Sequence, residues 1–194
     1  MIIGHYAAAL IPHERDPQTP LALYLFLANA ADFLWLGAAA VGLEAPVPRS
    51  LFEASFANLH VAMPFTHDLV PTMGWAVLAA AVVYAATRRG APAGWAAALV
   101  VAHEACDLLS GFSHWILGPA TPAIGLNLYG RAPEVALLLE AAFGAGCTWW
   151  FVRARARAGR PLSGSTKWGL YATFVAGALV WLPIARTPLA DWLR

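Results

Sequence analysis

Apolar residues fall into long uninterrupted runs that are separated by short polar connections. A helix needs about twenty apolar residues to cross the hydrocarbon core of a bilayer. Four runs reach this length, and a fifth is shorter but uncharged: Leu21–Leu43, Leu69–Thr87, Ala93–Leu117, Ala132–Val152 and Trp168–Ala185. The pattern therefore predicts an all-α, polytopic membrane helical bundle with about five transmembrane helices.

Two further stretches are apolar but too short or too polar to span a membrane. Ile2–Ile11 has about half the necessary length, so we expect a short N-terminal helix there. In Arg49–Met63, the apolar residues Leu51, Phe56 and Leu59 recur at near-helical spacing among polar residues. That spacing predicts an amphipathic helix lying on the membrane surface.

The composition agrees with a membrane protein and excludes several other classes. Of the 194 residues, 60% are hydrophobic and 12% are charged, and the mean hydropathy is +0.60. Soluble domains contain about twice this share of charged residues, so an ordinary soluble enzyme or a disordered chain is excluded. A net charge of +1 offers no basic field for nucleic acid. We expect one membrane domain over residues 1–194.

The distribution of basic residues predicts the orientation of the chain in the membrane. Seven of the twelve Lys and Arg residues lie in the connection between the second and third runs or in that between the fourth and fifth: Arg88, Arg89, Arg153, Arg155, Arg157, Arg160 and Lys167. Cytoplasmic loops carry an excess of basic residues. These two connections are therefore predicted to be cytoplasmic, and the loop Gly118–Arg131 to face outward.

Acidic residues and a histidine lie well inside the predicted spans, where no Lys or Arg could neutralise them. They are Asp32, His103, Glu104, Asp107 and Glu140. An ionised side chain at this depth costs roughly 2.5–3.5 kcal/mol on insertion scales. With a rise of about 1.5 Å per residue, these residues lie about 17–22 Å from the cytoplasmic ends of their helices. A shared depth predicts one cluster, stabilised by a divalent cation, by protonation or by a water-filled cavity.

His103 and Asp107 are one helical turn apart and therefore project from the same face of the third predicted span. An imidazole and a carboxylate at this spacing can bind one metal ion. The alternative is a His–Asp hydrogen bond that holds helices together.

Four short motifs resemble a known family. Gly4-His5, Ala31-Asp32, Phe65-Thr66-His67-Asp68-Leu69, and Ala102-His103 followed by Asp107 occur in this order between Gly4 and Pro122. In order and type they resemble the inner-membrane metal-dependent hydrolases, a family that includes a LexA-regulated member. The sequence departs from that pattern at Leu34, which replaces a second Asp, at Asp68, which replaces a Ser, and at Ala62-Met63, where a His-Arg pair is absent.

The resemblance implies five metal ligands within residues 1–122: His5, Asp32, His67, His103 and Asp107. It also implies a location in the bacterial cytoplasmic membrane. The helices in 131–194 match only as generic spans. His13, His60 and His114 are expected to lie at the membrane interface.

Two functions remain open from the sequence. The first is a membrane-embedded, metal-dependent hydrolase that acts on a lipid-like or lipid-linked substrate from the outer half of the membrane. Zinc or manganese would suit its mixed carboxylate and imidazole ligands, and Glu104 or Glu140 would be the general base. The second is a non-catalytic integral membrane subunit of a larger complex, whose histidines pack helices or ligate a tetrapyrrole. Membrane lipid is the expected partner in both cases, and nucleic acid in neither.

Overall fold

The computed structural model describes residues 3–50 and 52–194, and over this range the predicted all-α class is confirmed. In the part of the chain that the structure describes, strands are limited to a short hairpin of two residues each, β1 (His114–Trp115) with β2 (Ala123–Ile124). The helices, in chain order, are α1 (Gly4–Ala8), α2 (Leu10–Arg15), α3 (Leu21–Ala28), α4 (Ala30–Ala40), α5 (Leu69–Thr87), α6 (Gly90–Ser110), α7 (Leu128–Arg131), α8 (Pro133–Arg157), α9 (Gly164–Tyr171), η1 (Ala172–Ala176), α10 (Gly177–Leu179), η2 (Leu182–Ile184) and α11 (Leu189–Trp192).

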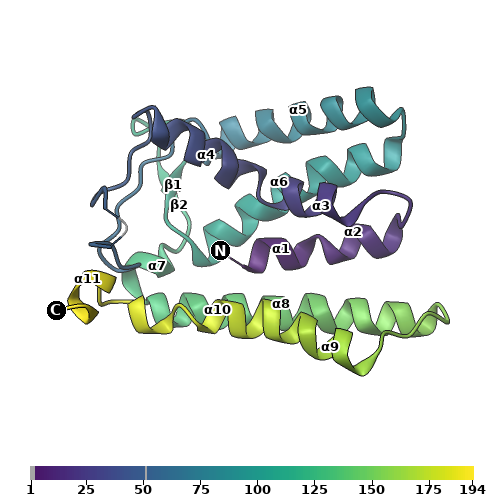
Figure 1. Ribbon diagram of the computed structural model, residues 1–194. Coiled ribbons are helices and arrows are strands. Elements are labelled where there is room, and N and C mark those ends of the chain that lie inside the picture. Colours follow the sequence, from purple (N-terminus) through teal and green to yellow (C-terminus); the bar gives the residue numbers. More distant parts are fainter. Residues whose placement is uncertain (1–2, 51) are drawn as a thin grey trace.

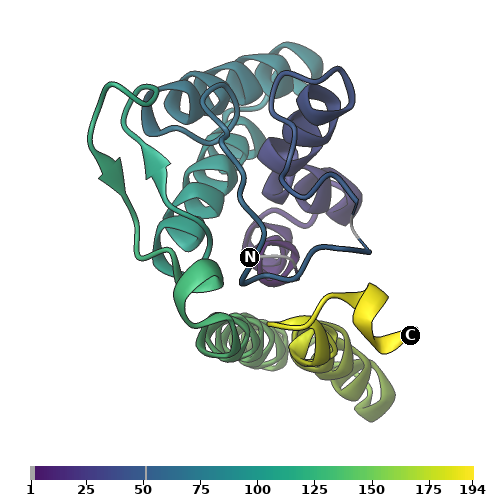
Figure 2. The ribbon, with the colours of Figure 1, turned by 90° about the vertical axis from the view of Figure 1, so that its left-hand side faces the viewer.

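The helices form two layers (Figure 1). The long helix α8 and the helical stretch from α9 to α10 pack as an antiparallel pair in one layer, and Figure 2 shows this pair nearly end-on. The antiparallel pair α5 and α6, together with α3, forms the other layer. The short helices α1 and α2 lie between the layers and contact α3 and α8. The N-terminal helix predicted for Ile2–Ile11 is thus present from Gly4 on and buried in the bundle; Ile2 lies outside the described residues.

Within the described residues, three helices are long and apolar enough to cross a membrane: Leu69–Thr87, Pro133–Arg157 and Gly164–Ile184. A fourth candidate is the pair α3 and α4, which is bent by 56°. This count differs from the expected five, because α6 does not belong to the set. At 21 residues α6 is long enough, but His103, Glu104 and Asp107 make it more polar than the other spans.

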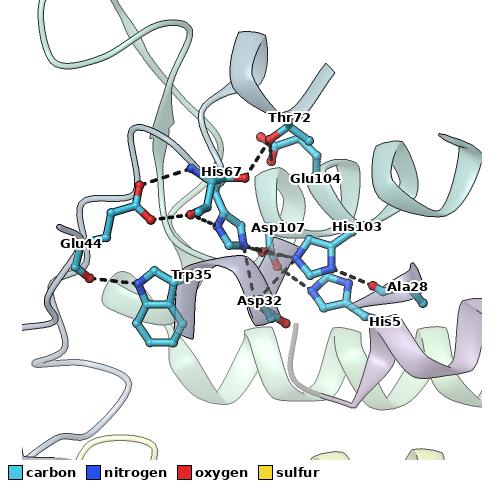
Figure 3. Close-up of polar contacts among 11 residues, drawn as sticks. His5, Ala28, Asp32, Trp35, Glu44, His67, Thr72, His103, Glu104 and Asp107 are labelled. Carbon is cyan, nitrogen blue, oxygen red and sulfur yellow. Dashed lines mark hydrogen bonds and ion pairs between the residues drawn. The ribbon is translucent and has the colours of Figure 1, made fainter. Parts of the chain in front are cut away.

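The bend between α3 and α4 occurs at Asn29. Its side chain donates a hydrogen bond to the carbonyl of Leu25 (3.2 Å), four residues earlier. Asn favours such local bonds over continued helix. As a result α4 starts in a new direction, and its first turn carries Asp32 toward α6 (Figure 3).

The prediction of an amphipathic surface helix over Arg49–Met63 is wrong. The described part of this segment consists of turns and irregular chain, with one bridge between Val47 and His60. Ser55 and Asn58 exchange side-chain to backbone hydrogen bonds of 2.7 and 3.3 Å. These bonds satisfy backbone groups locally and compete with a helix. Leu51 lies outside the described residues.

The third predicted span, Ala93–Leu117, ends earlier than expected. The helix α6 stops at Ser110, and the chain then turns into the β1–β2 hairpin. Asp68 holds this hairpin against the start of α5, because its carboxylate accepts hydrogen bonds from the backbone N–H groups of Trp115 (2.9 Å) and Gly118 (2.6 Å). The hairpin places His114 beside the residues that precede α5.

Candidate metal centre

Five residues predicted from the sequence converge at one place in the bundle (Figure 3). They come from four elements: His5 from α1, Asp32 from α4, His67 from the segment before α5, and His103 and Asp107 from α6. Their ligand atoms form two sets within 4.8 Å, His5–His103–Asp107 and Asp32–His67–His103. All are buried except Asp32, whose side chain is 36% exposed. These His and Asp groups could hold a metal ion.

The ring nitrogens of two histidines face each other at the centre of the cluster. His67 Nε2 lies 3.3 Å from His103 Nε2. Asp32 Oδ1 lies 3.4 Å from the first nitrogen and 3.7 Å from the second. Asp107 Oδ2 lies 3.9 and 3.6 Å from the same two atoms. Two nitrogens and two carboxylate oxygens are therefore directed at one small volume.

The backbone of α3 determines which nitrogen of His103 carries a proton. His103 Nδ1 lies 2.8 Å from the carbonyl oxygen of Ala28, which can only accept a hydrogen bond. Nδ1 must therefore be the donor, and the neutral ring presents the lone pair of Nε2 to the cluster. Metal-binding histidines are commonly oriented in this way, through a hydrogen bond from the nitrogen that faces away from the metal.

His5 contacts the cluster from the opposite side of Asp107. Its Nε2 lies 3.1 Å from Asp107 Oδ1, whereas Oδ2 of the same carboxylate faces the other two histidines. The His5 ring also stacks on that of His103, with 3.6 Å between the centroids. His5 can therefore orient Asp107 through a hydrogen bond or provide a ligand itself.

A pocket of about 440 Å³ begins at the cluster. Asp32, His67 and Asp107 form part of its wall. Most of the remaining wall is apolar and aromatic, and includes Phe33, Trp35, Leu36, Phe56, Trp181 and Ile184. Ala54, Ser55, Leu59, Val61 and Met63 also line it, so the segment predicted to be a surface helix instead covers the pocket.

Glu104 and Glu140, the predicted general bases, do not line this pocket. Glu104 Oε2 accepts a weak hydrogen bond from Thr72 on α5 (3.4 Å). Glu140 accepts hydrogen bonds from the backbone N–H groups of Ile3 and Gly4 (2.8 Å for Gly4) and from the Tyr129 hydroxyl (3.0 Å). Glu140 thus anchors the start of α1, which carries His5. The catalytic roles of both residues remain predictions.

Two polar residues beside the cluster were not identified from the sequence. His114, expected at the interface, is only 2% exposed, and its ring stacks on His67 with 5.4 Å between centroids. Glu44 is equally buried and bonds to the segment that precedes His67. Glu44 lies in a loop without periodicity, so no pattern marked it. His114 continues the spacing of His103, Asp107 and Ser110, and that was the available signal.

The chain was compared with protein-family models, curated proteins and solved structures, and none of them matches it.

Proposed function

We propose that this protein is a membrane-embedded, metal-dependent hydrolase whose substrate is lipid-like or lipid-linked. The observation that supports it is the position of the His/Asp cluster: three of its members form one wall of a largely apolar pocket. Hydrolysis needs polar groups that activate water, and a lipid chain needs an apolar cavity. Here the polar cluster residues Asp32, His67 and Asp107 border the apolar cavity directly. The topology predicted from the basic residues would place the pocket in the outer half of the membrane.

The donor geometry favours a single ion. His103 has only Nε2 to offer, because its Nδ1 is bonded to Ala28, so the two His/Asp sets that share His103 cannot both be complete. Tetrahedral zinc with Zn–N distances of about 2.0–2.1 Å separates two ligand nitrogens by about 3.3 Å. The His67–His103 separation is 3.3 Å. We assign His67, His103 and Asp107 as ligands, His5 as the residue that orients Asp107, and zinc or manganese as the metal. Three protein ligands leave the fourth tetrahedral position for water. Asp32, whose Oδ1 lies 3.4 and 3.7 Å from the two nitrogens, is then available as a base.

The chemistry follows from this assignment. A bound cation supplies a Lewis acid that polarises the scissile group and lowers the pKa of water. Asp32 belongs to the cluster, lines the pocket and is partly exposed, unlike the buried Asp107. We therefore assign proton transfer from the attacking water to Asp32, in preference to Glu104 or Glu140. The aromatic wall around Phe33 and Trp181 would hold the acyl or isoprenoid chain and exclude bulk water.

A chain-length series tests this function. Purified protein with zinc or manganese would be offered p-nitrophenyl esters and phosphodiesters with alkyl tails of increasing length. For the wild type we expect hydrolysis that is inhibited by chelator and becomes faster as the tail lengthens. Asp32→Asn should abolish hydrolysis. Leu36→Trp narrows the pocket and should remove the preference for long tails. Hydrolysis that persists with chelator, or that is equal in Asp32→Asn, would contradict the proposal.

The second candidate is a non-catalytic membrane subunit in which the cluster only packs helices. The close stacking of His5 on His103 favours it, as does the ability of a proton, in place of a metal, to bridge His67 and Asp32. A tetrapyrrole bound between two histidines fits less well. Its iron would need the two nitrogens about 4 Å apart, and His67 and His103 are closer than that. Metal content separates this candidate from the hydrolase.

A further inference from the structure

Glu44 is a buried carboxylate outside the cluster, and all its side-chain bonds in the described part of the chain go to the segment that carries His67. Its Oε1 accepts hydrogen bonds from the backbone N–H groups of Phe65 (2.6 Å) and Thr66 (3.2 Å). Its Oε2 accepts one from the Thr66 hydroxyl (2.6 Å). Three donors to one carboxylate are typical of its charged form, and bonds to a charged acceptor are stronger than neutral ones. Glu44 therefore fixes both the backbone and the hydroxyl of Thr66.

Thr66 in turn contacts His67. The Thr66 hydroxyl oxygen lies 2.9 Å from His67 Nδ1. A hydroxyl has one hydrogen to donate and two lone pairs that accept. Because the hydrogen of Thr66 is directed to the Glu44 carboxylate, the oxygen is left as an acceptor for Nδ1. His67 Nδ1 must therefore be the donor.

We infer that Glu44 is a positioning residue that acts through Thr66 to keep the proton of His67 on Nδ1, so that Nε2 presents its lone pair to the cluster. This inference rests on the proposed metal-dependent function, which it deepens. Once both tautomers are fixed, by Glu44–Thr66 and by Ala28, two lone pairs face each other at 3.3 Å. Such an arrangement is repulsive unless a cation lies between the nitrogens.

The hydrogen bonds from Glu44 through Thr66 to His67 form a relay, and Glu44 also connects this relay to the helix that carries Asp32. The indole N–H of Trp35 on α4 donates a hydrogen bond to the Glu44 backbone carbonyl (3.1 Å). Trp35 lines the pocket together with Asp32 and His67. One loop residue therefore contacts both α4, which carries Asp32, and the segment before α5, which carries the ligand His67.

The substitution Glu44→Gln should reverse the relay. The amide oxygen can still accept from the backbone N–H groups, but the NH₂ group then faces Thr66 and donates to its oxygen. The Thr66 hydrogen is displaced toward His67 Nδ1, and the ring proton moves to Nε2. We expect zinc affinity to fall about 10–100-fold, the range typical for the loss of a residue that orients a metal-binding histidine. The visible spectrum of the cobalt-substituted protein should change as well.

Three variants separate positioning from a general loss of structure. Thr66→Ser keeps the hydroxyl and should bind zinc with near wild-type affinity, whereas Thr66→Val removes it and should weaken binding. Glu53→Gln changes an exposed acid in the following loop and should have no effect. If Glu44→Gln does not fold, the contrast between serine and valine still tests the relay.

The ring ¹⁵N shifts of His67 in metal-free protein give a readout that does not depend on metal binding. They can be assigned by comparison with His67→Gln. We expect protonated Nδ1 in wild type and Thr66→Ser, and protonated Nε2 in Glu44→Gln. A proton that stays on Nδ1 in Glu44→Gln, or equal zinc affinities for Thr66→Ser and Thr66→Val, would overturn the inference. A wild type with the expected tautomer but no metal binding would instead overturn the proposed function and leave the relay supported.

Discussion

Asp107 uses its two carboxylate oxygens in different directions. Oδ1 contacts His5, and Oδ2 faces His67 and His103. If a metal is bound, the carboxylate is a charged ligand. If the cluster is only a packing device, it is a hydrogen-bond acceptor that an amide can replace.

The substitution Asp107→Asn therefore has opposite effects in the two cases. With a metal, we expect the metal affinity of the variant to fall by at least about tenfold. The melting temperature of the variant in the presence of metal should also be lower than that of wild type, because the cation no longer offsets the buried acids. With packing alone, the variant should be neutral or slightly more stable, since a neutral amide costs less in lipid than a carboxylate. Melting temperatures with and without chelator would be measured for both proteins.

The matched control is Asp191→Asn, which changes an exposed acid in α11 that pairs with Arg194. It should leave both the metal affinity and the response to chelator unchanged. A melting temperature of Asp107→Asn equal to that of wild type under every condition would exclude a structural cation at this site.

At the scale of elements, α8 and η1 pack through a glycine. A Cβ added at Gly144 would lie 2.7 Å from the backbone oxygen of Phe174, which cannot move aside as a side chain can. We expect Gly144→Ala to separate these helices and to lower the free energy of unfolding by about 1–3 kcal/mol. Gly146→Ala on the same helix meets no atom within 4 Å and should be neutral or stabilising by up to about 1 kcal/mol. Equal unfolding curves for the two variants would contradict this packing.

Asp16 joins the α2–α3 connection to the turn between α5 and α6. Its carboxylate accepts hydrogen bonds from Thr19 (2.6 Å), Tyr24 (2.9 Å) and Arg89. Burial alone would raise the pKa of Asp16, but the hydrogen bonds from Thr19, Arg89 and Tyr24 outweigh it and hold the pKa below its usual 3.8. The charged form is therefore favoured in the folded state.

This shift gives the stability of the protein a predictable dependence on pH. A depressed folded-state pKa contributes stability that is complete above the unfolded value of 3.8 and is lost as the pH falls through the folded value. Asp16→Asn should lower stability near neutral pH by about 1–2 kcal/mol, a modest value because Arg89 is partly exposed. The difference from wild type should shrink below pH 3.8 in denaturant titrations. A difference that stays constant through this range would contradict the assignment.

For the molecule as a whole, the sequence was most informative where an element depends only on its own residues. The predicted bounds of Leu69–Thr87 match α5 because an unbroken apolar run is followed at once by two arginines and a glycine. The common depth predicted one cluster of Asp32, His103, Glu104, Asp107 and Glu140, and the structure brings Asp32, His103 and Asp107 together. Glu104 and Glu140 bond to Thr72 and to the start of α1 instead.

The predictions failed where local side-chain hydrogen bonds or contacts between distant residues determine the backbone conformation. Ser55 and Asn58 replace a helix with turns, and Asn29 bends the first span. Glu44 acquires its partners only when the loop after α4 folds against the start of α5. Neither periodicity nor composition encodes that contact, so the bonds between Glu44 and the segment before His67 could be found only from the structure.

The orientation in the membrane is a prediction for the whole molecule. Gly90 begins α6 at its turn with α5, and Ala123 lies in β2; both residues are exposed. That turn and the β1–β2 hairpin lie at opposite ends of the bundle (Figure 1). We expect an impermeant thiol reagent to label Ala123→Cys but not Gly90→Cys in intact cells. Cys106 and Cys147 are buried and should contribute little background. The reverse labelling pattern would mean that the topology is inverted.

The metal content of the purified protein tests the central claim most directly. The protein would be extracted without chelator, offered zinc or manganese, freed of unbound ions and analysed by mass spectrometry of its metals. The proposal predicts about one ion per chain, a near-complete loss in His103→Ala, and no change in His60→Ala, which alters an exposed histidine away from the cluster. A wild type that binds neither metal, or a His103→Ala variant that binds as much as wild type, would contradict it.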